Sequence, residues 1–192
     1  VIGNDIRNIE EQLYPYGVDS IFYLSDSRLS SYLTLPFFSV ITKLITEKTP
    51  DIVLFGATSV GRDLAPRIAS YLRCGLTADC TNLEIGSHHD AKNNKTYDNI
   101  LYQIRPAFGG NIVATIVSPE TRPQMATVRE GVMKKEIYNE NHKGTVINLE
   151  AKDYLNEKDF CIEILERHIE AQKINIKGAS IIVAGGYGVG SK

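Results

Sequence analysis

The sequence predicts an α/β fold: a mostly parallel sheet with flanking helices, extended by additional antiparallel strands. In the first half, short apolar runs alternate with stretches of helical periodicity, which is typical of parallel strands joined by helices. In the second half, several strand-like segments follow one another between turn residues, which favours antiparallel pairing. Between them, residues 51–73 have the pattern of a strand, a glycine-containing turn and a helix, the repeating unit of a parallel sheet.

Apolar spacing and helix-ending residues place the elements of the first half. Asp5 is a possible N-cap for the first helix, and Pro36 lies in the first turns of the second, where its missing N–H costs least. The apolar run 52–55 is typical of a strand covered on both faces, and Gly75 is a suitable end for the following helix. The predicted elements are the end of a strand at 1–4, a helix over 5–14, a strand over 20–24, a helix over 30–48, a strand over 52–55 and a helix over 62–73.

Segments of strand character dominate the second half. Residues 160–169 are ambiguous, because alternating and helical apolar spacings overlap there. Residues 180–184 form a continuous apolar run, predicted to be a buried strand, and glycines follow it. The other predicted strands cover residues 79–85, 100–104, 112–117, 125–128 and 145–149, with turns over 86–94, 108–111 and 119–123.

The composition excludes several classes of protein. The 192 residues include 21 Lys and Arg against 23 Asp and Glu, a net charge of −2, so we expect no nucleic-acid binding. No apolar run approaches the roughly 20 residues that span a bilayer, so we expect no membrane insertion. Three cysteines are too few for a disulfide framework, which favours a cytoplasmic setting. The start at Val1 and the glycine-rich end lead us to expect a fragment of a longer protein.

The turn between Gly56 and Gly61 has two interpretations. Thr58, Ser59 and backbone N–H groups could hold a phosphate at the start of the next helix, with Arg62 adding charge. The turn nevertheless lacks the Lys-Ser/Thr of a P-loop, and it is not a Gly-x-Gly-x-x-Gly motif. A simple helix cap is therefore the favoured interpretation.

Residues 105–111 join two predicted strands through a loop with an arginine, a phenylalanine and a Gly-Gly-Asn sequence. The glycines could simply form a turn, whereas an exposed aromatic and arginine would suit a partner surface. Elsewhere, the sequence at 88–90, His-His-Asp, favours a solvated loop over a metal site, and Cys74 and Cys80 favour small buried thiols. No cluster supplies a nucleophile, a base or a metal site, so a self-contained enzyme is the weaker hypothesis.

Five segments occur in an order and at a spacing that are specific in combination. They are Asp51-Ile-Val-Leu-Phe-Gly-Ala-Thr-Ser-Val-Gly-Arg-Asp-Leu-Ala-Pro-Arg67, Gly75-Leu-Thr-Ala-Asp-Cys-Thr81, Arg105-Pro-Ala-Phe-Gly-Gly-Asn111, Thr127-Val-Arg-Glu-Gly131 and Ser180-Ile-Ile-Val-Ala-Gly-Gly-Tyr-Gly188. Together they resemble the α subunit of electron transfer flavoproteins over roughly residues 50–192.

That resemblance implies a function carried by a cofactor. In the family, the α subunit forms a heterodimer with a β subunit, and an FAD in a second, doubly wound domain carries electrons between dehydrogenases and an acceptor. Acyl-CoA or other flavin dehydrogenases are the expected partners. Some members take part in electron bifurcation, with a second FAD in the β subunit in place of AMP.

The resemblance also implies a division of the chain. Residues 1–178 would be the N-terminal domain without its first strand and helix, and residues 179–192 the first strand and loop of a truncated FAD-binding domain. The FAD loop would be Gly185, Gly186, Tyr187 and Gly188, with Tyr187 where the family has an arginine that approaches the FAD pyrophosphate. The turn 56–61 matches the place where the related β subunit holds a nucleotide phosphate, but the α subunit is not expected to bind one there.

We therefore predict a scaffold domain that docks on the β subunit, and an electron carrier subunit rather than an enzyme. The predicted interface is the loop with Arg105, Phe108, Gly109, Gly110 and Asn111. One alternative is a nucleotide-binding ligase or hydrolase domain that uses the turn from Gly56 to Gly61. Another is an intact FAD-binding electron carrier.

Overall fold

The structure is a computed structural model that describes residues 1–6, 8–107, 112–168, 176 and 179–190. It divides into two compact units, Val1–Cys161 and Ile162–Lys192, and each is described here by itself. The first unit contains β1 (Ile2–Gly3), α1 (Glu10–Leu13), η1 (Tyr14–Tyr16), β2 (Ser20–Ser25), η2 (Ser27–Leu29), α2 (Thr34–Lys48), β3 (Ile52–Gly56), α3 (Ser59–Leu72), β4 (Leu76–Cys80), β5 (Asn82–Asp90), β6 (Lys95–Pro106), β7 (Val113–Ile116), β8 (Gln124–Val128), β9 (Thr145–Asn148), α4 (Ala151–Tyr154) and η4 (Glu157–Phe160).

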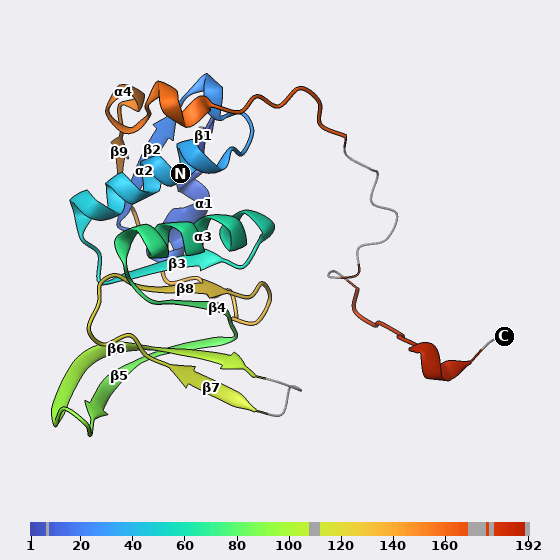
Figure 1. Ribbon diagram of the computed structural model, residues 1–192. Coiled ribbons are helices and arrows are strands. Elements are labelled where there is room, and N and C mark those ends of the chain that lie inside the picture. The colour runs from blue at the N-terminus through green and yellow to red at the C-terminus, as the bar shows by residue number, and fades with distance from the viewer. Residues whose placement is uncertain (7, 108–111, 169–175, 177–178, 191–192) are drawn as a thin grey trace. The chain divides into compact units, whose positions relative to one another are not determined.

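Parallel strands form two sheets in the first unit (Figure 1). One sheet has the order β1-β2-β9, and the other has the order β3-β8-β4. All four neighbouring pairs are parallel, with Phe22 of β2 opposite Ile147 of β9 and Leu54 of β3 opposite Ala126 of β8. Because β8 lies between β3 and β4, a segment far along the chain joins two strands that are close in sequence.

The remaining strands form an antiparallel sheet in the order β5-β6-β7. It follows directly from the second parallel sheet, since the N–H of Thr81 donates to the carbonyl of Ile104 at 2.8 Å just after β4 ends. The predicted fold class, a mostly parallel α/β arrangement with added antiparallel strands, is therefore confirmed.

Helix α2 connects the two parts of the core. Val40 on this helix packs with Leu24 of β2 and with Tyr154 of α4. One and a half turns later, Ile45 packs with Ile68 of α3 and with Met125 of β8. All of these side chains are at most 8% exposed, so burial of one amphipathic helix stabilises both parallel sheets.

Several predicted boundaries are wrong for identifiable reasons. The first helix begins only at Glu10, because Asp5 and Asn8 have positive φ values of 46° and 61°, so Asp5 is not its N-cap. Helix α3 ends in a left-handed residue at Arg73 rather than at Gly75. The predicted strand 79–85 is divided at Thr81 into β4 and β5, and the predicted turn 86–94 is largely strand, with residues 91–94 as its turn.

The strand β3 is not covered on both faces as predicted. Helix α3 covers one face, where Val53 and Phe55 pack against its core cluster, but Leu54 on the other face is 51% exposed. The apolar run therefore predicts the strand correctly but its covering incorrectly, because a continuous apolar run does not show whether one face of the strand is covered or both.

The second unit holds one short element, η6 (Tyr187–Val189), among its described residues. No strand forms over residues 180–184, and Ile181 and Val183 are 84% and 94% exposed. The prediction of a buried strand is thus wrong for this chain. A strand needs a neighbouring strand for its backbone N–H and C=O groups, and the described residues provide none here.

Candidate functional site

The carboxyl ends of three parallel strands meet along one edge of the first unit. In Figure 1, β3, β8 and β4 all end toward the right, and β6 ends on the same side. In open α/β sheets, this edge is where ligands usually bind, because the loops that follow the strands gather there. The residues at and just after these strand ends form the candidate site.

The turn between β3 and α3 is a helix cap. The hydroxyl of Thr58 accepts a hydrogen bond from the N–H of Gly61 at 3.1 Å, and the carbonyl of Thr58 accepts the first helical bond, from Arg62, at 2.9 Å. Gly61 is required for a close approach, since a Cβ at this position would lie 1.9 Å from the carbonyl oxygen of Gly56. The cap interpretation of this turn is confirmed.

Asp79, near the carboxyl end of β4, has a strained backbone conformation. Its φ of 62° falls where the register between β4 and β8 shifts, and its N–H donates to the hydroxyl of Thr127 at 2.8 Å. The side chain is 21% exposed and accepts bonds from two arginines. Arg129 donates from Nη2 at 2.7 Å and from Nε at 3.2 Å, and Arg62 donates from Nη2 at 3.3 Å.

The arginines hold Asp79 in its ionised form. The hydrogen bonds from Arg129 lower the pKa of the Asp79 carboxyl, and the charges of Arg129, Arg62 and Arg105 act in the same direction. Burial raises the pKa by less than the Arg129 bonds lower it. Burial raises the pKa of the neighbouring Cys80 thiol, and the charge of Arg105, at the end of β6, acts against this rise. We call Arg62, Arg105 and Arg129 around Asp79 the arginine patch.

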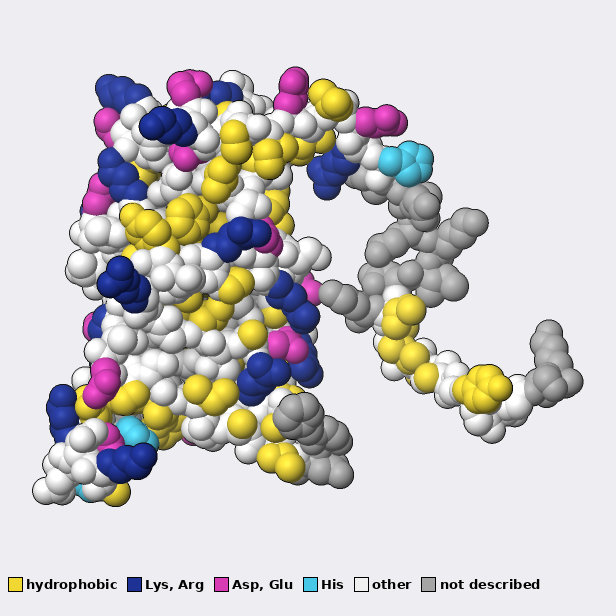
Figure 2. Space-filling model, viewed as in Figure 1, with side chains coloured by type: hydrophobic (Ala, Val, Ile, Leu, Met, Phe, Trp, Pro, Cys, Tyr) yellow, Lys and Arg dark blue, Asp and Glu magenta, His cyan; other side chains and the backbone are white. Residues whose placement is uncertain are grey.

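The patch faces the solvent. The Arg62 and Arg129 side chains are 60% and 44% exposed although both are held by Asp79, and Arg105 is half-buried. Figure 2 shows basic side chains with acidic ones between them along the right-hand edge, where the parallel strands end in Figure 1. Three cations around one carboxylate leave an excess of positive charge.

The patch draws on four of the five segments that carried the family resemblance. Arg62 comes from the segment 51–67, Asp79 from 75–81, Arg105 from 105–111 and Arg129 from 127–131. The loops after β3, β4 and β8, together with the end of β6, bring these segments together. Asp79 and Arg129 stand inside these motifs, but the sequence alone predicts no role for either residue. Their position within the motif segments is the sequence signal that could have marked them as candidate site residues.

The residues predicted as sites have mixed outcomes. Arg105 belongs to the patch, whereas Phe108, Gly109, Gly110 and Asn111 lie outside the described residues. The proposed FAD loop, residues 185–188, is exposed in the second unit, so its role stays a prediction.

The remaining candidate residues have structural roles. The sequence at 88–90 lies in β5 rather than in a loop, and no group of three potential metal ligands exists among the described residues. Cys80 is buried, and the half-buried Cys74 contacts the sulfur of Met125 at 3.2 Å. Within the described part of the chain, no helix has the length and apolar character needed to cross a membrane.

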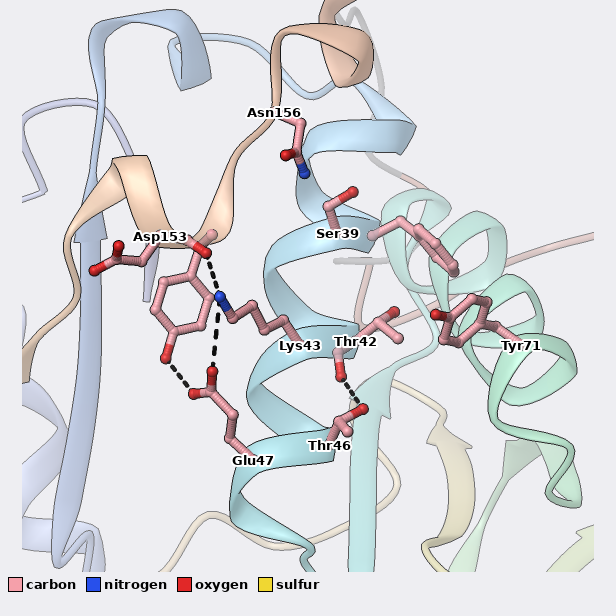
Figure 3. A pocket seen from close by; sticks show the side chains of 10 residues that line it. Ser39, Thr42, Lys43, Thr46, Glu47, Tyr71, Asp153 and Asn156 are labelled. Atoms are coloured by element: carbon pink, nitrogen blue, oxygen red, sulfur yellow. Dashed lines mark hydrogen bonds and ion pairs between the residues drawn. The ribbon is translucent and has the colours of Figure 1, made fainter.

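A second feature is an open pocket of about 520 Å³ between α2, α3 and α4 (Figure 3). Its polar side chains largely bind one another. The Tyr154 hydroxyl donates to Glu47 at 2.5 Å, and the Lys43 ammonium donates to the carbonyl of Asp153 and lies 3.9 Å from Glu47. Thr42 is buried, and its hydroxyl has no hydrogen-bond partner among the residues that the structure describes. The cluster attaches α4 to α2, and we assign it a structural role.

A buried amide near the patch was also missed by the sequence analysis. Gln103 on β6, two residues before Arg105, is fully buried, and neither amide atom has a hydrogen-bond partner within the described part of the chain. Gln124 is also fully buried, but its side-chain oxygen accepts a hydrogen bond from the N–H of Leu101 at 2.8 Å. A glutamine inside a strand pattern carries no sequence signal that distinguishes a buried position from an exposed one.

Comparisons with known proteins identify the family of this chain. The family described as "Electron transfer flavoprotein domain" matches residues 1–154, about four fifths of the chain. The chain belongs to the electron transfer flavoprotein family. The resemblance to the N-terminal domain of the α subunit is confirmed by relatives of that name.

Three relatives illustrate the range of names and coverages among the similar proteins. "Electron transfer flavoprotein subunit alpha" of Thermoanaerobacterium thermosaccharolyticum is 44% identical over 99% of this chain and 54% of its own length. The protein of the same name from Megasphaera elsdenii is 38% identical over 100% of this chain and 54% of its own length. "Lactate dehydrogenase (NAD(+),ferredoxin) subunit LctC" of Acetobacterium woodii is 38% identical over 98% and 42%. The chain thus spans about half the length of the curated relatives it matches.

Proposed function

We propose that this chain is the scaffold and docking domain of an electron transfer flavoprotein α subunit, joined to a β subunit in a heterodimer. The observation that carries the proposal is the convergence of four motif segments on one exposed, charged edge. A structural core does not require three arginines at a surface, whereas arginine is enriched where proteins contact one another. The relatives are named as subunits, which supports a partner for this chain.

The whole protein would carry electrons through FAD between acyl-CoA or other flavin dehydrogenases and an acceptor, with a second FAD or AMP in the β subunit. Support for flavin chemistry comes from the family to which the chain belongs. One relative is named as a subunit of a lactate dehydrogenase that uses NAD and ferredoxin, which favours a bifurcating complex as one form of this function.

We also propose that residues 1–178 are an N-terminal domain lacking its first strand and helix, and that residues 179–192 begin an FAD-binding domain. The two parallel sheets support the first part. Among the described residues, β1 and β3 are both edge strands, and one further parallel strand paired with each would unite the sheets. The exposed apolar run 180–184 supports the second part, because none of the described strands pairs with it.

Docking is tested by expressing the full-length chain with its β subunit and measuring the complex. The double substitution Arg105→Ala with Phe108→Ala should weaken β-subunit binding, while Lys92→Ala in the β5–β6 turn should leave it unchanged. An unaltered affinity of the double variant would contradict a role for the loop. A full-length pair that does not associate would contradict the docking function itself.

The division of the chain is tested by colour. FAD retained on a protein is yellow, so the isolated 192-residue chain should be colourless and the full-length heterodimer yellow. Stoichiometric FAD on the isolated chain would contradict the assignment of the cofactor to the remaining domain. In that case, the alternative of an intact FAD carrier would stand.

A further inference from the structure

We propose that Arg62 and Arg129, held in register by Asp79, are a docking point for side-chain carboxylates on the partner subunit. The inference rests on the proposed docking function, and it names the chemistry of the contact. Arg62 lies in the first turn of α3 and Arg129 directly after β8, so neither belongs to the loop 105–111.

The two arginines are aligned before any partner arrives. The Asp79 carboxylate accepts hydrogen bonds from Nε and Nη2 of Arg129. Arg62 donates from Nη2 to Asp79 and from Nε to the carbonyl of Ala57, the latter at 2.9 Å. The backbone N–H of Asp79 in turn donates a hydrogen bond to the hydroxyl of Thr127. Two long side chains therefore lose little further rotamer freedom when they bind, which reduces the entropic cost of association.

Donors remain available on the outer side. Within the described residues, Nη1 of Arg62 and Nη1 of Arg129 have no hydrogen-bond partner. Both side chains keep about half of their surface exposed. The three arginines of the patch carry three positive charges, and Asp79 and the adjacent Glu130 carry two negative ones. One positive charge therefore remains at the patch. The patch thus fits an anionic group approaching from the solvent.

The arrangement favours carboxylates over a phosphate. Asp79 already occupies the Nε–Nη2 edge of Arg129, one of the two guanidinium edges that can hold a phosphate with two parallel hydrogen bonds. The fixed negative charge of Asp79 would also repel a dianion at contact distance more strongly than a single carboxylate. The remaining Nη1 groups suit single bonds to separate carboxylate oxygens.

The flanking residues indicate a protein partner. Val60 lies two residues before Arg62, and Val132 and Met133 follow Arg129; these side chains are 40%, 39% and 42% exposed. Arginines with exposed methionine and aliphatic neighbours have the composition of a protein interface. The patch also shares its edge with the end of β6, so it continues the surface proposed for docking.

The test measures the affinity of the full-length chain for its β subunit at low and at physiological salt. Arg62→Gln combined with Arg129→Gln should raise Kd by about tenfold or more and flatten its salt dependence. The matched control is Arg122→Gln, which removes another Arg–Asp pair, with Asp51 at 3.6 Å, near the opposite end of β8. It should leave both quantities unchanged. Thermal unfolding of each isolated variant verifies that it folds.

The possible results are distinguishable. If the wild-type subunits bind and the double variant binds equally well, the carboxylate docking point is wrong while the docking function stands. If the wild-type subunits do not bind, the docking function fails first. Titration of the full-length chain with inorganic phosphate provides a further check. Phosphate binding that Arg129→Gln abolishes would overturn the assignment to carboxylates, and no heat of binding would support it.

Discussion

The Arg129 guanidinium grips the Asp79 carboxylate through two parallel hydrogen bonds, Nη2 to Oδ2 at 2.7 Å and Nε to Oδ1 at 3.2 Å. Fifty residues separate the two in sequence, and they meet because β4 and β8 are adjacent parallel strands that end at the same edge. The pair joins the end of β4 to the residue that follows β8. It also gives Arg62 a fixed anion to bind, so the geometry of the edge depends on one aspartate.

Asp79→Asn should reduce stability at neutral pH and have less effect in acid. The native pKa of Asp79 is lowered, so protons bind the unfolded chain more readily, and the carboxylate stabilises the fold above the unfolded pKa of about 3.9. That contribution is lost as the pH falls through the native pKa. Urea unfolding of both proteins at pH 7 and at pH 3 measures the difference. Asp51→Asn, at a carboxylate that is 90% exposed, is the control and should change stability little at either pH.

Tyr154→Phe should destabilise the attachment of α4 by about 1 kcal/mol, because it removes the hydrogen bond to Glu47. This bond, with burial, raises the pKa of Tyr154 to about 12. A raised phenol pKa contributes stability below the unfolded value of about 10, and this is lost as the pH rises toward 12. Burial also raises the pKa of Tyr32, so ultraviolet titration should show one late-ionising tyrosine fewer in the variant than in the wild type. Equal stability of the two proteins at pH 8 would argue against the assigned bond, and Tyr138→Phe, at a 75% exposed ring, serves as the control.

Gly61→Ala should destabilise the fold by about 3 kcal/mol. The added methyl would lie 1.9 Å from the carbonyl oxygen of Gly56, a backbone atom that cannot move without shifting β3 or α3. Gly188→Ala is the control, since a Cβ there would meet no atom within 4 Å, and it should change the free energy of unfolding by less than about 0.5 kcal/mol. Denaturant unfolding compares them, and similar midpoints for the two variants would refute the close approach.

Thr58→Ala should cost about 1 kcal/mol, because the N–H of Gly61 loses its acceptor at the start of α3. Thr58→Ser keeps the hydroxyl and should retain most of the wild-type stability. Thermal unfolding monitored by circular dichroism compares the three proteins. A serine variant as unstable as the alanine variant would show that the threonine methyl, rather than the cap, supplies the stabilisation.

Much of the local structure could be predicted because its causes are local. The strand–turn–helix unit at β3 and α3 follows from an apolar run, a hydroxyl cap and helical spacing, and the cap at Thr58 is where these signals put it. Boundaries failed where backbone conformation depends on neighbours, as at Asp5 and at Arg73, both with positive φ. The segment 180–184 failed for a related reason, because strand character in the sequence does not provide a strand to pair with.

The sequence by itself determined the fold class, the family and the motif segments, because periodicity and motif order are properties of the chain alone. Only the tertiary structure decided what those segments do together. It brought Arg62, Asp79 and Arg129 within hydrogen-bond distance, although they are up to 67 residues apart (129 − 62). Strand order is the physical reason: placing β8 between β3 and β4 brings their loops to one edge, and no local pattern encodes that order.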